Sequence, residues 1–66
     1  MTIDDYIEQR NAIQFKAELI SEEAAAARWI ELGVANRHIE RVLAGEMQLT
    51  PAVEYEIADC LRRNSV

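Results

Sequence analysis

The sequence predicts an all-α fold: a compact bundle of four helices, or five if one of them splits. Three observations lead to this prediction. Apolar residues recur at helical spacing through most of the 66 residues. Residues that cap helices, Thr2, Ser21 and Thr50, stand before three of these stretches, and acids or a proline follow them. Gly33 and Gly45 stand where two of the stretches end.

The first helix is expected to occupy residues 1–20. Two acids follow Thr2 in its first turn, where the helix dipole favours negative charge. Phe15 lies at the margin of an apolar surface wider than one partner helix needs, so this part is either core or a dimer contact. The apolar stripe consists of Ile3, Tyr6, Ile7, Ile13, Ala17 and Ile20.

Residues 21–45 are expected to hold two helices joined by a short turn. Trp29 is predicted to lie in the core, and Gly33 to close the first helix in the left-handed conformation. A second helix would begin within two or three residues, with Asn36 as its capping side chain. Its inward face would consist of Ile39, Val42 and Leu43. A helix, a glycine-containing turn and a short second helix make up a helix-turn-helix.

Residues 50–63 are predicted to form the C-terminal helix. Thr50 supplies a hydroxyl cap and Pro51 occupies the first helical position, where its missing N–H costs nothing. Cys60 lies on the apolar face of this helix and is expected to be a buried, structural thiol. Residues 64–66 are expected to fray.

The outward face of the second helix in residues 21–45 carries side chains that can contact bases. At about 100° per residue, Arg37 and Arg41 point most directly outward, with His38 and Glu40 on the flanks. Arginine can bind guanine, asparagine adenine, and glutamate can accept from cytosine. Solvated pairing of Arg37 with Glu40 is the structural alternative. The predicted DNA-binding residues are Asn36, Arg37, His38, Glu40, Arg41 and the phosphate-contacting Gln48.

The segment LGVANRHIERVLAGE resembles one shared by helix-turn-helix proteins of the phage-repressor (Cro/C1-like, Xre-type) and lactose-repressor types. The stretch from Leu49 to Leu61 is similar to the fourth helix of Xre-type domains, and the resemblance covers roughly residues 24–61. Trp29 stands where the family has Ala, and Arg28 where it has an apolar residue. The resemblance implies a homodimeric, repressor-like transcriptional regulator, without a cofactor, whose second motif helix enters the major groove of a palindromic operator.

Charge supports a different class as the alternative. The net charge is −5, whereas DNA-binding domains are usually basic, although residues 28–45 hold three bases against two acids. An acidic protein-interaction module on the same scaffold, such as an anti-repressor, a phage inhibitor or an antitoxin-like partner, is therefore the second interpretation. Paired carboxylates, metal-ligand clusters and nucleophile–base arrangements are missing from the pattern, so an enzyme is not expected. The single cysteine and the lack of a long apolar run fit a cytoplasmic protein outside the membrane.

Overall fold

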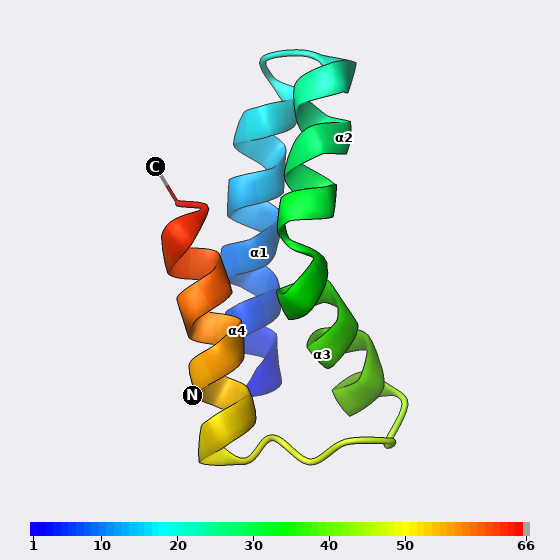
Figure 1. The fold of residues 1–66 in the computed structure, drawn as a ribbon, viewed down its shortest axis with the longest axis vertical. Helices are drawn as coiled ribbons and strands as arrows, with labels where there is room; N and C mark the ends of the chain where they lie inside the picture. Colours follow the sequence, from blue (N-terminus) through cyan, green and yellow to red (C-terminus); the bar gives the residue numbers. More distant parts are fainter. Residues whose placement is uncertain (66) are drawn as a thin grey trace.

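The computed structural model describes residues 1–65 and is all-helical over that range (Figure 1). Its four helices are α1 (Ile3–Glu18), α2 (Glu22–Glu31), α3 (Gly33–Leu43) and α4 (Pro51–Arg63). The predicted all-α, four-helix class is confirmed. The first helix ends at Glu18, two residues before the expected end of the N-terminal segment.

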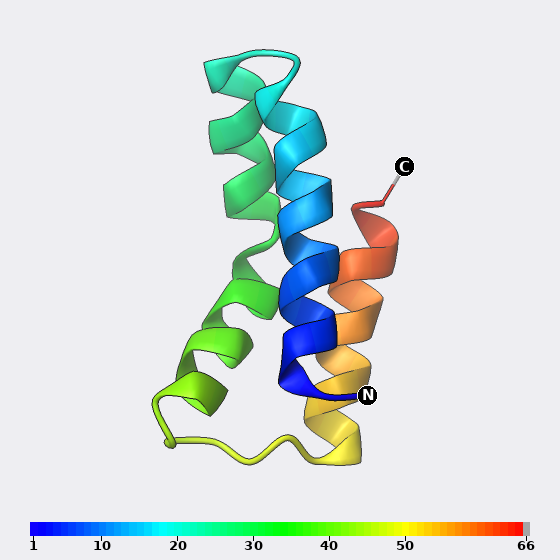
Figure 2. The ribbon, with the colours of Figure 1, turned by 180° about the vertical axis from the view of Figure 1, so that it is seen from behind.

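The long helix α1 lies at the centre of the bundle. Helices α2 and α3 follow each other back along one side of α1, and α4 lies along its other side (Figures 1 and 2). Helix α4 begins at the same end of the bundle as α1 and stops short of the α1–α2 connection. One end of the elongated molecule is therefore a two-helix hairpin, and the other end contains α1, α3 and α4.

Each of the three predicted caps is present. The Thr2 backbone N–H donates to Asp5 Oδ2 at 2.9 Å, so the acid of the first turn closes the start of α1. Ser21 Oγ accepts from the backbone N–H of Ala24 at 3.0 Å, and Thr50 Oγ1 accepts from that of Val53 at 3.3 Å. These bonds satisfy N–H groups that have no partner within their own helices, which fixes where α1, α2 and α4 begin.

The prediction for the α2–α3 junction is wrong. A single residue, Leu32 (φ −82°, ψ 8°), separates the two helices, and Gly33 is already the first residue of α3. Gly33 does not adopt a positive φ, so it does not close α2 in the left-handed conformation. The junction is a break between successive helices, at which the side chain of Leu32 is fully buried in the core.

Two side chains bind backbone carbonyls that this break leaves free. Asn36 Nδ2 donates to the carbonyl of Trp29 at 3.3 Å, and the Cys60 thiol donates to the carbonyl of Glu31 at 3.7 Å. Asn36 is therefore not the cap of α3; it lies inside that helix, and Leu32 is the N-cap residue without a capping side chain. The predicted burial of Cys60 is confirmed at 1% exposure.

The predicted stop at Gly45 is confirmed. Gly45 has φ +76°, its N–H donates to Val42 O at 3.1 Å, and the Glu46 N–H donates to Arg41 O at 2.9 Å. This pair of bonds is a Schellman motif, which satisfies the last carbonyls of α3 and turns the chain into the connection to α4.

The core is formed where α1, α3 and α4 meet. Leu32 and Ile57 are completely buried there, and Ile3, Ile7, Ile13, Leu49 and Val53 pack around them. The cluster also contains Tyr6, Ala35, Ile39, Cys60 and Leu61. The predicted stripes of α1 and α4 thus contribute most of the core.

Four sequence-based burial predictions are wrong. Ile20 is 78% exposed in the turn that follows α1, and Leu43, the last residue of α3, is 61% exposed. Trp29 is 45% exposed, since α2 packs through its other side against α1. Asn64 does not fray: it is buried, and its amide donates to Cys60 O at 2.7 Å. Val66, also expected to fray, lies outside the described residues.

The two glycines give a direct test of the junction. No atom lies within 4 Å of a Cβ built at either position, so their backbone conformations decide the outcome. We expect Gly33→Ala to leave the free energy of unfolding unchanged or raise it by up to about 1 kcal/mol, because alanine favours helix. Gly45→Ala should lower it by about 1 kcal/mol, because φ is positive there. Urea denaturation of both variants measures this, and a loss at Gly33 of the size seen at Gly45 would contradict the observed junction.

A buried phenol joins α1 to α4. The Tyr6 hydroxyl donates to Glu54 Oε1 at 2.9 Å, and the N-terminal amine of Met1 lies 3.7 Å from the same oxygen. Burial of Tyr6, then the hydrogen bond to Glu54 and its negative charge, raise the pKa of the phenol above its usual value of 10.0. The folded state therefore holds this proton more tightly than the unfolded chain does.

The raised pKa of Tyr6 predicts that the free energy of unfolding declines at alkaline pH. Because the pKa of the Tyr6 phenol is raised in the folded state, its contribution to the free energy of unfolding is fully present below about pH 10. This contribution is lost as the pH rises through the folded-state pKa. Tyr6→Phe should lower the free energy of unfolding by about 1 kcal/mol at pH 7 and should flatten its alkaline decline. Urea denaturation at pH 7 and pH 10.5 measures both effects. Tyr55→Phe, at a 68% exposed position, is the control and should decline like the parent protein.

Candidate nucleic-acid interface

Helix α3 presents a fixed outer face because its inner face is anchored. Ala35 and Ile39 are fully buried one turn apart, and they hold α3 against α1 and α4. Residues three and four apart share a helix face, so the positions between these anchors point to the outside. The predicted site residues divide between the two faces.

Arg37 and Arg41 are both exposed and lie one turn apart on the outer face of α3. Within residues 1–65, neither guanidinium has an acid within 4.0 Å. By contrast, Arg28 pairs with Glu31 at 3.3 Å, and Arg62 and Arg63 both pair with Asp59, Arg63 at 3.1 Å. The two arginines of α3 are therefore free to meet an external anion.

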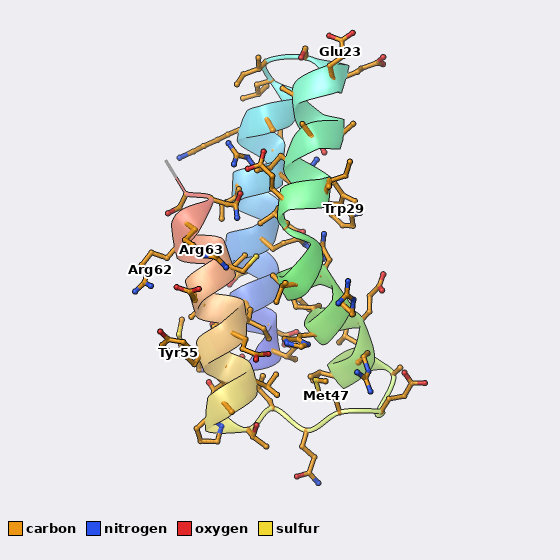
Figure 3. All side chains as sticks on the ribbon, viewed as in Figure 1. Glu23, Trp29, Met47, Tyr55, Arg62 and Arg63 are labelled. Atoms are coloured by element: carbon orange, nitrogen blue, oxygen red, sulfur yellow. The ribbon has the colours of Figure 1, made fainter. Side chains whose placement is uncertain are left out.

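Glu40 and Gln48 are exposed as well. Glu40 lies on α3 between the two arginines, and its predicted alternative pairing with Arg37 is not formed. Gln48 lies in the connection after α3, beside half-buried Met47, which Figure 3 labels near the end of α3. These two side chains and those of Arg37 and Arg41 are therefore all exposed on α3 and on the connection that follows it.

His38 is tied to α4. Its Nε2 contacts a carboxylate oxygen of Glu56, and its side chain is only 15% exposed. Nδ1 is buried without a hydrogen-bond partner among the described residues. His38 thus joins α3 to α4, and a direct contact with a base would require that this pairing be broken.

Asn36 is 6% exposed and faces the interior. Its Oδ1 accepts from Arg10 Nη1 at 3.0 Å, while its amide holds the Trp29 carbonyl. The Arg10 guanidinium also lies over the Trp29 ring, 5.2 Å from its centroid. Both polar atoms of the Asn36 side chain are therefore bound inside the protein, and a contact of Asn36 with DNA would require these bonds to break.

This polar cluster is what sequence reasoning missed. Arg10 and Asn11 appear in the sequence only as an interruption of the apolar stripe of α1, yet Arg10 joins three helices through Trp29 and Asn36. A polar residue inside an apolar stripe was the available signal, since a buried polar group must find a partner. Figure 3 shows Trp29 on the side of α2 that faces away from α4.

Comparison of the chain with models of known protein families, with curated proteins and with solved structures gives no match. No helix within residues 1–65 combines the length and the apolar character needed to cross a bilayer. The same range holds no group of three or more histidine, cysteine, aspartate or glutamate side chains placed to bind a metal ion.

The position of Asn36 leads to a stability prediction. Asn36→Ala should lower the free energy of unfolding by about 1–3 kcal/mol, because it leaves Arg10 and the Trp29 carbonyl without their partner. Arg37→Ala, on the exposed face of the same helix, should change it by less than about 0.5 kcal/mol. Thermal and urea denaturation compare the two variants. Equal, small effects would show that Asn36 does not hold the α2–α3 junction.

Proposed function

We propose that this chain is a small sequence-specific DNA-binding transcriptional regulator that places α3 in the major groove. One observation carries the proposal: Arg37 and Arg41 are exposed, lie one turn apart and have no acidic partner, on a helix anchored through its opposite face. An arginine in this setting can bind guanine through two hydrogen bonds or pair with a phosphate. The resemblance of residues 32–46 to repressor motifs supports the same function.

The roles of the remaining site residues follow from their positions. Glu40 lies between the arginines and would accept from cytosine while repelling misplaced phosphates. Gln48 would contact the backbone from the α3–α4 connection. His38 would act indirectly by holding α3 to α4 through Glu56, and Asn36 by fixing the start of α3. The predicted direct roles of these two residues are thereby replaced by positioning roles.

A homodimer is part of this proposal. Two arginines from one copy make few phosphate contacts, and phosphate contacts dominate nucleic-acid affinity. Two copies on a two-fold axis would double the contacts and place two α3 helices about 34 Å apart on a palindromic site. Phe15, 57% exposed on α1, offers apolar surface for such a contact.

The proposal is tested by selecting bound fragments from genomic DNA at 50 mM and 150 mM salt. We expect enrichment of one palindromic site, with affinity that falls as salt rises. Arg37→Ala and Arg41→Ala should each weaken binding by about 1–3 kcal/mol if the residue contacts guanine. Arg63→Ala removes the same charge from a position paired with Asp59 and is the matched control. Loss of affinity equal to that of the control would remove α3 from the interface.

A protein-interaction module is the second candidate, because the molecule exposes much apolar surface. Nine large apolar side chains are exposed in 65 described residues, among them Ile30 at 78% and Trp29 at 45%. Where such side chains gather into one contiguous patch, they supply the apolar area that a protein partner buries. Failure of the folded protein to enrich any DNA, even at 50 mM salt, would favour this candidate.

A further inference from the structure

A groove of about 480 Å³ runs along α1 on the side of the C-terminal half of α4. Gln9, Ala12, Ile13, Lys16 and Ala17 of α1 line it, together with Ile20 in the turn that follows α1. Arg28 of α2, Ala58, Leu61 and Arg62 of α4, and Asn64 and Ser65 beyond α4 complete its lining. No residue of α3 lines the groove, so it is separate from the proposed DNA-binding face.

The α1 residues in the groove have the spacing of a helix-packing face. They stand at i, i+3, i+4, i+7 and i+8, which places them on one side of α1 over about 12 Å, and Ile20 extends the groove into the turn beyond the helix. Ala17 and Leu61 form a buried floor, whereas Ile20 at the far end is 78% exposed. The small side chains of Ala12 and Ala58 let another helix approach closely. This shape fits a helix of about three turns better than a small molecule, which binding sites usually enclose on most sides.

The groove is lined by three cations, two of which are paired with acids outside the lining: Arg28 with Glu31, and Arg62 with Asp59, which Arg63 shares. Its lining includes Lys16, Arg28 and Arg62 and not one acid, although the whole chain has net charge −5. Lys16 has no ion pair within residues 1–65. Arg28 Nη1 donates to Asn64 Oδ1 at 2.9 Å and to Glu31 Oε2 at 3.3 Å, which holds this guanidinium at the wall. Figure 3 shows Arg62 near the C-terminal end of α4.

We propose that this groove docks an acidic amphipathic helix of a partner protein. The apolar face of the partner helix packs on Ile13, Ala17 and Ile20, and its flanking carboxylates meet Lys16, which has no ion pair, and Arg62, which shares Asp59 with Arg63. Helix-in-groove binding of this kind uses anchors at i, i+3 or i+4, and i+7. A second copy of this chain placed symmetrically, groove against groove, would bring like charges together, so charge complementarity favours a different, acidic partner.

The test uses a 14-residue helical peptide with three leucines on one face and glutamates on both flanks. It is titrated into the isotopically labelled full chain at 150 mM salt, and amide shifts are followed by NMR. We expect shifts at Gln9, Lys16 and Asn64, with none at Arg37 or Arg41. A peptide with lysine in place of each glutamate, and one with glycine in place of each leucine, should bind at least tenfold more weakly.

Variants of the protein separate this site from the proposed DNA-binding face. Lys16→Glu should weaken binding of the glutamate peptide about threefold or more, while DNA affinity stays that of the parent protein. Arg41→Glu makes the same type of charge reversal outside the groove and should leave peptide affinity within a factor of 1.5. Ile20→Ser removes an exposed apolar contact without disturbing the core, and should also weaken the peptide.

Several results would overturn the proposal. Equal binding of the glutamate and lysine peptides would show that the charge of the partner helix does not matter. Equal effects of Lys16→Glu and Arg41→Glu would show that the peptide does not bind in the groove. Shifts of the groove residues on raising the protein concentration without peptide would show that a second copy fills the groove. If the folded protein binds the peptide but no DNA, the proposed DNA-binding function has failed. If it binds DNA but not the peptide, the proposed groove site has failed.

Discussion

The arrangement of the helices depends on the break at Leu32. If α2 continued straight into α3, the pair would form one rod of more than 20 residues along α1; the break changes the direction of the chain, and α3 contacts α4 as well as α1 (Figures 1 and 2). Leu32 is completely buried, so the chain bends around its side chain, and Asn36 and Cys60 bind carbonyls that the bend leaves free. The cost of an interrupted helix is thereby offset by burial and by two hydrogen bonds.

The same break decides which face of α3 meets solvent. Fixing Leu32 inside places Asn36 and Ile39 inward at the next turns and leaves Arg37 and Arg41 outward. The inward Asn36 requires a donor, which Arg10 of α1 supplies at 3.0 Å. The site residues are thus divided by the geometry of one junction, and the proposed binding face is the part of α3 that this geometry leaves free.

Much of the fold could be predicted from the sequence because its signals are local. Thr2, Ser21 and Thr50 mark helix starts through bonds within three residues, and Gly45 marks a stop through its positive φ. The α2–α3 junction could not be predicted, since a glycine serves equally well in a left-handed turn and in a first helical turn. The pairing of Arg10 with Asn36 joins residues 26 apart in sequence, and such contacts arise only when tertiary packing is formed.

An acidic protein can bind an anionic partner only where its cations are not already neutralised, and the ion pairs of this chain decide where that is. Asp59 holds Arg63 and pairs with Arg62, and Glu31 holds Arg28, so α4 and α2 offer little free positive charge to a large polyanion. Among the exposed cations without an ion pair in residues 1–65, Arg37 and Arg41 share one face of α3, whereas Lys16 lies apart from them on α1. Under the proposed function, so few phosphate contacts per copy would give low non-specific affinity for DNA, because each contact contributes one step of counterion release. Useful affinity would then have to come from base contacts and from a second copy, and the acidic surface would favour high selectivity. Screening at physiological salt acts over about 8 Å, so the acids beyond this distance oppose α3 only weakly.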